Sequence, residues 1–149
     1  KLSDLFSLAK PCKYLAVLAY IRPSARTDAA LNTFRKSVLN RYQIATATGY
    51  GPRYLHSTGQ LHKSGPNTGL FLELVERTAP DSQIPGAPYT FGTLARAQAI
   101  GDWPSLNAHG RPVVRVELGR QGLSTLKALI LGRTGVTGRK TRQAAGGSR

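Results

Sequence analysis

The sequence has few cysteines, few acidic side chains and no long apolar runs, and each shortage excludes a class of structure. Cys12 is the only cysteine, so the chain cannot form an internal disulfide, and a reducing, cytoplasmic location is expected. Its place beside an apolar run predicts a small core residue rather than a nucleophile. No apolar run approaches the roughly 20 residues that span a bilayer, so no membrane association is predicted. The chain starts at Lys1, without methionine or a secretory hydrophobic region, which indicates a processed product or a fragment.

The scarcity of acidic residues leaves the chain strongly basic. Lysine and arginine total 21 against 7 aspartates and glutamates in 149 residues, which gives a net charge of +14. No acidic residue follows Glu117, whereas residues 133–149 contain Arg133, Arg139, Lys140, Arg142 and Arg149. We therefore predict a folded domain over residues 1–132 and a basic, flexible tail over 133–149. Such a tail can bind nucleic acid by releasing counterions, and a disordered end without a partner is the alternative.

Hydrophobic periodicity predicts strands that alternate with helices. Strands are expected near residues 14–21, 43–48, 69–76 and 112–118. Helices are expected over 2–9, from Thr27 as a cap to about 41, after Thr90 as a cap, and on Leu123, Leu126 and Ile130. Strands joined through helices form right-handed crossovers and a parallel sheet. The fold class is therefore predicted to be α/β, a three-layer αβα sandwich.

The stretch "GPRYLHSTGQLHKSGPNTG", residues 51–69, concentrates the reactive side chains of the chain. It follows the second predicted strand, at the carboxyl edge where parallel sheets bind ligands. We predict a loop whose glycines and hydroxyls surround an anionic oxygen, with Arg53 and Lys63 supplying positive charge. His56 can exchange protons near neutral pH, and His62 is assigned to the outer side of the loop. The two histidines have no carboxylate or thiolate nearby, so neither a metal site nor a cofactor is predicted.

Two motifs in this order resemble the phosphoglucose isomerases. The histidine-containing segment of that family has a His-Ser-x-Gly-Gln pattern, which is matched here by His56, Ser57, Thr58, Gly59 and Gln60. The stretch "IPGAPYTFGTLARAQAIGD" is similar to the family's Tyr-Thr-Phe-Gly helix. Together they look most like the C-terminal end of bifunctional transaldolase/glucose-6-phosphate isomerase enzymes, over roughly residues 12 to 119. The resemblance implies a sugar isomerase (SIS) fold, present here as a partial or single SIS subdomain.

The resemblance also implies an activity, the interconversion of glucose 6-phosphate and fructose 6-phosphate. The family's histidine assists opening of the sugar ring, and here it is His56. The substrate-binding residues would be Arg53, Ser57, Thr58, Gly59, Gln60 and Lys63. The family's catalytic glutamate precedes the histidine by some tens of residues, and Asp28 is the only acidic residue near that distance, at a predicted helix start. A histidine bonded to the backbone is the structural alternative for His56.

Two hypotheses follow for the whole chain. In the first, it is the C-terminal domain of an isomerase, incomplete alone, which supplies His56 and part of the sugar-phosphate pocket. Its partners would be sugar phosphate, the remainder of a larger isomerase or transaldolase–isomerase chain, and a second copy in a homodimer. In the second, it is an inactive, reused α/β domain that binds RNA or a large complex through its basic surface.

Overall fold

The computed structural model describes residues 2–76, 81–118, 124 and 128. Apart from 124 and 128, the helix predicted on Leu123, Leu126 and Ile130 lies outside these residues, as does the predicted tail over 133–149. The elements in chain order are α1 Leu2–Phe6, β1 Tyr14–Tyr20, α2 Ala25–Tyr42, β2 Ala45–Tyr50, the 3-10 turn η1 Arg53–His56, α3 Thr58–Ser64, β3 Gly69–Glu76, α4 Phe91–Ala108 and β4 Val113–Leu118. Strands and helices alternate as the sequence predicted.

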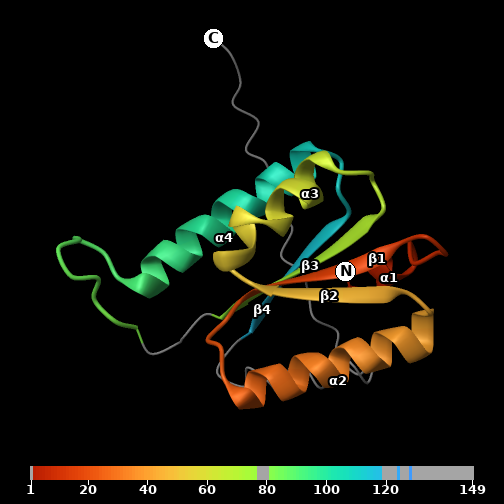
Figure 1. Cartoon of the computed structure of the whole chain (residues 1–149), viewed down its shortest axis with the longest axis horizontal. Helices are drawn as coiled ribbons and strands as arrows, with labels where there is room; N and C mark the ends of the chain where they lie inside the picture. Colours follow the sequence, from red (N-terminus) through yellow and green to blue (C-terminus); the bar gives the residue numbers. More distant parts are fainter. Residues whose placement is uncertain (1, 77–80, 119–123, 125–127, 129–149) are drawn as a thin grey trace, which may run out of the picture.

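The four described strands form one parallel sheet in the order β2-β1-β3-β4. Figure 1 shows α2 on one side of this sheet and α3 and α4 on the other. The chain is therefore an α/β protein with a three-layer arrangement, as predicted. The crossover through α2 moves outward from β1 to β2, whereas later crossovers move toward β4. The direction thus reverses between β1 and β3, and parallel sheets of this order bind ligands at the carboxyl end of that reversal point.

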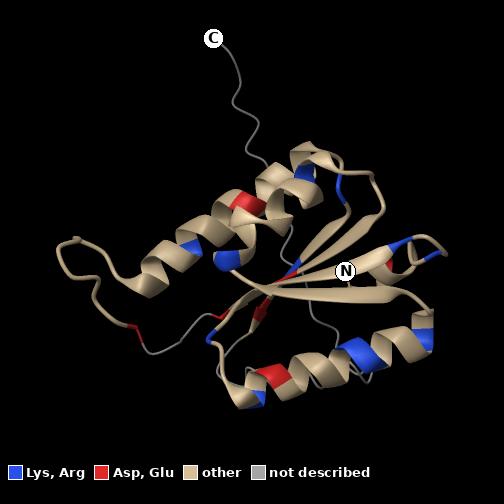
Figure 2. Cartoon of the chain, viewed as in Figure 1, with Lys and Arg blue, Asp and Glu red and all other residues tan. Residues whose placement is uncertain are grey.

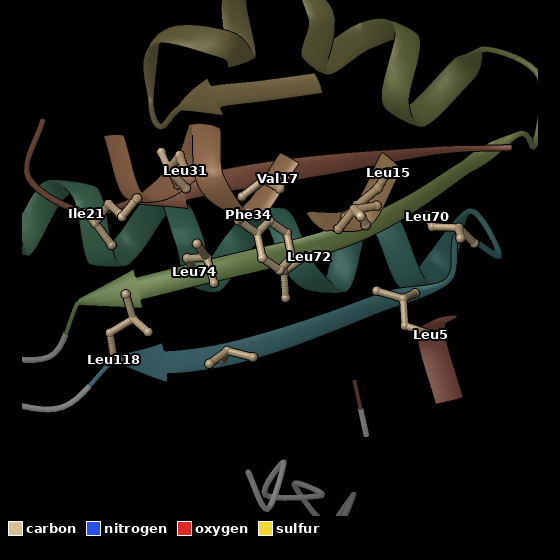
Figure 3. Close-up of a cluster of buried hydrophobic side chains, with 14 of the residues drawn as sticks. Leu5, Leu15, Val17, Ile21, Leu31, Phe34, Leu70, Leu72, Leu74 and Leu118 are labelled. Carbon is tan, nitrogen blue, oxygen red and sulfur yellow. The ribbon is translucent and has the colours of Figure 1, made fainter. Parts of the chain in front are cut away.

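Two apolar clusters fill the space on the two sides of the sheet. Alternate residues of β1 and β3 point to α2, and Figure 3 shows Leu15, Val17, Leu72 and Leu74 gathered around Phe34. Phe34 is only 1% exposed, and a fully buried side chain of this size stabilises the fold by roughly 1.5–3 kcal/mol. The opposite side of the sheet packs against η1 and α4 through a smaller cluster: Ala16, Leu18, Tyr20, Tyr54, Phe71, Ala99 and Leu106. The buried polar residues His62, Glu73 and Asp102 lie on this same side of the sheet.

Two local predictions were wrong. Helix α2 is capped by Ser24, whose hydroxyl accepts from the Thr27 backbone N–H, so Thr27 lies inside the first turn and not at the cap. Thr27 is buried, and its hydroxyl donates to the Arg22 carbonyl. Cys12 is exposed in a turn with φ of 70°, not a core residue. Thr90 does cap α4, accepting from the Thr93 backbone N–H, as predicted.

Candidate functional site

The stretch predicted as a loop after β2 is mostly helical. It contains η1 and α3, which meet at Ser57. This compact element has two faces. Its exposed residues are Arg53, His56, Ser57, Thr58, Gln60, Leu61 and Ser64. Its buried or half-buried residues are Tyr54, Leu55, Gly59, His62 and Lys63. The polar residues singled out in the sequence are therefore divided between solvent and the interior.

Tyr54 anchors this element to the rest of the domain. Its ring is 5% exposed and packs edge-on against Tyr20, the last residue of β1. Its hydroxyl donates to the Asp102 carboxylate of α4 and lies 2.9 Å from the Tyr20 hydroxyl. Tyr54 has a single hydroxyl proton, and it donates this proton in the hydrogen bond to the carboxylate. In the second bond Tyr20 is therefore the donor and the Tyr54 oxygen is the acceptor. Burial and the bond to Asp102 raise the pKa of Tyr54, so it stays a neutral donor. One side chain thus ties η1 to both β1 and α4.

Lys63 also binds Asp102, from the other end of the element. Its Nζ lies 2.8 Å from Asp102 Oδ1, and the Asp102 side chain is only 3% exposed. The sequence prediction gave Lys63 to a bound anion, and the structure places its ammonium group in this internal ion pair. The pair compensates a carboxylate that would otherwise be buried without a counter-charge. Asp102 therefore accepts a hydrogen bond from Tyr54 and forms an ion pair with Lys63, and both of these residues belong to the segment after β2.

His62 lies inside the protein, so its assignment to the outer side of a loop was wrong. It is 7% exposed, and its ring packs near Tyr54 and Phe71 at centroid distances of 6.0 and 5.1 Å. Its Nδ1 has no hydrogen-bond partner among the described residues. Burial lowers the pKa of His62, which keeps the imidazole neutral at pH 7. His62 is a packing residue, and of the two histidines in the stretch only His56 is exposed to solvent.

Two glycines let the tyrosines approach the sheet. A Cβ on Gly49 would lie 2.9 Å from the Tyr54 Cβ. A Cβ on Gly51 would lie 2.6 Å from Tyr20 Cδ1 and closer still to Cε1. Both contacts are shorter than real carbon atoms adopt, so larger residues would push Tyr54 or Tyr20 away. The glycines around the second strand thus serve the close packing of the anchor.

A second buried ion pair lies on the same side of the sheet, and the sequence analysis missed it. Glu73 is fully buried in the middle of β3, and Arg115 of the neighbouring β4 donates to it over 2.6 Å. Arg115 also donates to the Ala99 carbonyl of α4. Burial raises the pKa of Glu73, and Arg115 opposes that shift. A lone glutamate within the apolar run "GLFLELVE" was the available signal, since a buried charge requires a partner.

Asp28, considered in the sequence for the role of a base, has another partner. Its Oδ1 accepts from the Tyr50 hydroxyl at 2.6 Å, which links α2 to the end of β2. No group of three or more His, Cys, Asp or Glu that could hold a metal ion occurs within the ranges that the structure describes. Among the same residues, no helix is both long and apolar enough to cross a membrane.

Comparison with known proteins supports the fold class and no more. The sequence matches no protein-family model and no curated protein. Among solved structures, the chain is similar to a hypothetical protein, TT0462, from Thermus thermophilus, with a TM-score of 0.70 and 18% sequence identity. The similarity covers 87% of this chain and 35% of that one, so the chain spans about a third of the length of its structural neighbour.

Proposed function

We propose that this chain is a sugar-phosphate isomerase domain of the phosphoglucose isomerase type, which supplies one side of a substrate site completed by further polypeptide. One observation supports this most: the exposed polar side chains of residues 53–60 stand on an element that is fixed from below through Tyr54 and Lys63. A connecting segment needs no such arrangement. Substrate sites do need it, since their contact residues must be held in place by rigid support.

The exposed side chains suit a polyhydroxylated phosphate ester. Arg53 offers a fixed fork of donors for phosphate, and Ser57, Thr58 and Gln60 offer donors and acceptors for sugar hydroxyls. His56 would deliver the proton that a ring oxygen needs when it leaves as a hydroxyl, because an imidazole exchanges protons near neutral pH. Gly59 is buried, and a Cβ there would lie 3.3 Å from the Tyr54 carbonyl oxygen, so both Gly59 and Lys63, the latter through Asp102, would act by supporting the site from below.

Three acidic residues of the domain already have internal partners and are poor candidates for the base that moves a proton between the two sugar carbons. Glu73 and Asp102 are buried and ion-paired, and Asp28 is bound by Tyr50. In this proposal the base belongs to the remainder of a larger chain, or to a second copy in a homodimer. Without that part, the isolated domain would bind sugar phosphate weakly and would not catalyse isomerisation.

The test has a binding arm and an activity arm. Fructose 6-phosphate is titrated into the labelled chain, and amide shifts are followed over residues 53–60, with fructose and inorganic phosphate as controls. We expect saturable shifts with fructose 6-phosphate, which His56→Ala weakens and His109→Ala does not, since His109 caps the far end of α4. In the parent enzyme, His56→Ala should lower isomerisation about 10²- to 10⁴-fold. No loop shift up to millimolar ligand, or parent activity within about threefold of wild type, would contradict the proposal.

A second candidate, an inactive domain that binds RNA or a large complex, is favoured by the net charge of +14. Most of that charge lies outside the described part of the chain, which contains all seven acidic residues and twelve of the 21 basic ones. The basic tail over 133–149 contributes five of the 21 basic residues without any acidic one, so it is the segment on which this candidate can be tested. Removal of residues 133–149 should abolish binding to a homopolymeric RNA if it is correct, and leave fructose 6-phosphate binding intact if the first proposal is correct.

A further inference from the structure

The outer edge of β2 carries backbone groups that nothing in the described chain uses. The strand order places β2 at the margin of the sheet. The Gly51 N–H donates to the Ala19 carbonyl at 3.0 Å, so the backbone of Gly51 faces β1. Successive residues of a strand direct their N–H and C=O groups to opposite sides. Thr46, Thr48 and Tyr50 therefore direct theirs away from the sheet.

One of these outward groups is occupied. The Thr46 carbonyl accepts from Arg35 Nε of α2 at 3.2 Å, and the same guanidinium donates to Asn32 at 3.1 Å. Within the described residues, the outward N–H and C=O groups of Thr48 and Tyr50 have no protein partner. The edge thus offers a short ladder of free donors and acceptors, with Arg35 held across its beginning.

This edge lacks the features by which proteins usually block strand pairing. Sheet edges are commonly protected by lysine, proline or a bulge. Residues 45–49 are Ala, Thr, Ala, Thr and Gly, without charge or proline, and they pair with β1 in unbroken register. The side chains of Ala45, Ala47 and Thr48 are exposed. A second strand could therefore approach residues 45–49 without meeting a bulky or charged side chain of β2, and the hydroxyl of Tyr50, which follows them, is bonded to Asp28.

The charge around the edge selects the partner. The adjacent helix α2 carries Arg26, Arg35, Lys36 and Arg41, and Figure 2 shows basic positions in blue along this helix. Its single acidic residue, Asp28, already accepts from the Tyr50 hydroxyl. Two copies of this edge would bring two chains of net charge +14 together, and like charge opposes that pairing. An acidic strand would be attracted instead.

We propose that the outer edge of β2 binds an extended, acidic peptide segment by strand addition. Main-chain hydrogen bonds to Thr46, Thr48 and Tyr50 supply the pairing, as in other cases of added strands. A carboxylate on the incoming segment draws the Arg35 guanidinium away from the Thr46 carbonyl, which frees that acceptor for the ladder. Arg35 thereby selects for acidic segments, and the inference is independent of any isomerase role.

The test uses a short capped peptide in which glutamate alternates with valine and threonine, and a matched peptide with lysine in place of glutamate. Amide shifts and hydrogen exchange of the labelled chain are measured with each. We expect the glutamate peptide to slow exchange at Thr46, Thr48 and Tyr50 while Ala47 and Gly49, whose N–H groups face β1, change little. This alternation separates strand addition from diffuse attraction between charges.

Two charge-reversal variants complete the test. Arg35→Glu should weaken binding of the glutamate peptide by about tenfold or more, whereas Arg41→Glu, with the same change in net charge at the end of α2, should weaken it only about twofold. Equal effects of the two variants would overturn the proposal, as would equal binding of the lysine peptide or protection without alternation. Protection of the same amides that rises with protein concentration alone would assign the edge to a second copy and would equally overturn it.

Discussion

Removal of Arg115 should destabilise the domain much more than removal of its whole ion pair with Glu73. Glu73 lies in the sheet with 1% of its side chain exposed, and Arg115 Nε donates to it over 2.6 Å. Arg115→Met would leave this carboxylate buried without a counter-charge and would also lose the bond to the Ala99 carbonyl. In Glu73→Leu/Arg115→Met, by contrast, no buried charge remains.

Removing one partner of a buried pair typically costs about 3–5 kcal/mol in free energy of unfolding. Because the Arg115 side chain is 27% exposed, water screens part of its charge, and we expect about 3 kcal/mol for Arg115→Met. The double variant should lie within about 1 kcal/mol of wild type. Burial raises the folded-state pKa of Glu73 above its ordinary value of 4.5, so ionisation of Glu73 destabilises the fold as the pH rises through that window. The Arg115→Met deficit should therefore shrink toward pH 4.5.

The measurement is urea unfolding followed by far-UV circular dichroism, at neutral and at acid pH. It gives the free energy of unfolding of wild type, of both single variants and of the double variant. The pair is confirmed by a coupling energy of about 2 kcal/mol or more between the two positions. Additive single effects, or a cost below about 1 kcal/mol for Arg115→Met as for an exposed pair, would refute a desolvated Glu73. An unchanged deficit at acid pH would refute the titration argument.

Three further predictions concern the support of the candidate site. Tyr54→Phe should cost about 1.5–3 kcal/mol because it removes a buried bond to a carboxylate, whereas Tyr50→Phe, which loses a bond to exposed Asp28, should cost less than about 1 kcal/mol by chemical denaturation. The folded-state pKa of His62 is lowered, so stability should fall as the pH drops below the unfolded-state value of 6.5, and His62→Leu should flatten stability curves measured in that window. Gly51→Ala should lower the melting temperature by collision with Tyr20, while Gly101→Ala, with open space around it in α4, should raise stability by about 1 kcal/mol.

The sheet was predictable because its evidence is periodic. Three strands begin and end within about a residue of their predicted bounds, and the apolar face of α2 is buried at the helical spacing of Ala30, Leu31, Phe34 and Val38. The second strand starts later than predicted, because Ile44 packs into the core while Gln43 ends α2 in the left-handed conformation. It also extends through Gly49, where the absent side chain makes room for Tyr54. A glycine that seemed to end the strand is thus a packing feature of it.

The interior of the candidate site could not be predicted in this way. Asp102 and Tyr54 are far apart in the chain, and nothing in the sequence around either residue indicates that it is buried or bonded to the other. Their bond depends on the crossover that brings α4 beside η1, and the burial of His62 depends on its packing near Tyr54 and Phe71. Helical periodicity is weak evidence over a seven-residue helix such as α3, with glycine inside it and directly after it. Short elements take their orientation from tertiary contacts, and the sequence does not encode those contacts locally.

The division of residues 53–64 into two faces also affects how a shared motif should be interpreted. A match of residue types cannot tell which members contact a substrate and which hold the others in place, since both kinds are polar here. The structure separates them: Lys63 and Tyr54 meet at Asp102, whereas His56, Ser57 and Gln60 make no such internal bond among the described residues. The exposed side chains on this rigid support are the ones that we propose to contact a ligand. Substitutions on the two faces should therefore separate, with stability lost on the inner face and sugar-phosphate binding lost on the outer face.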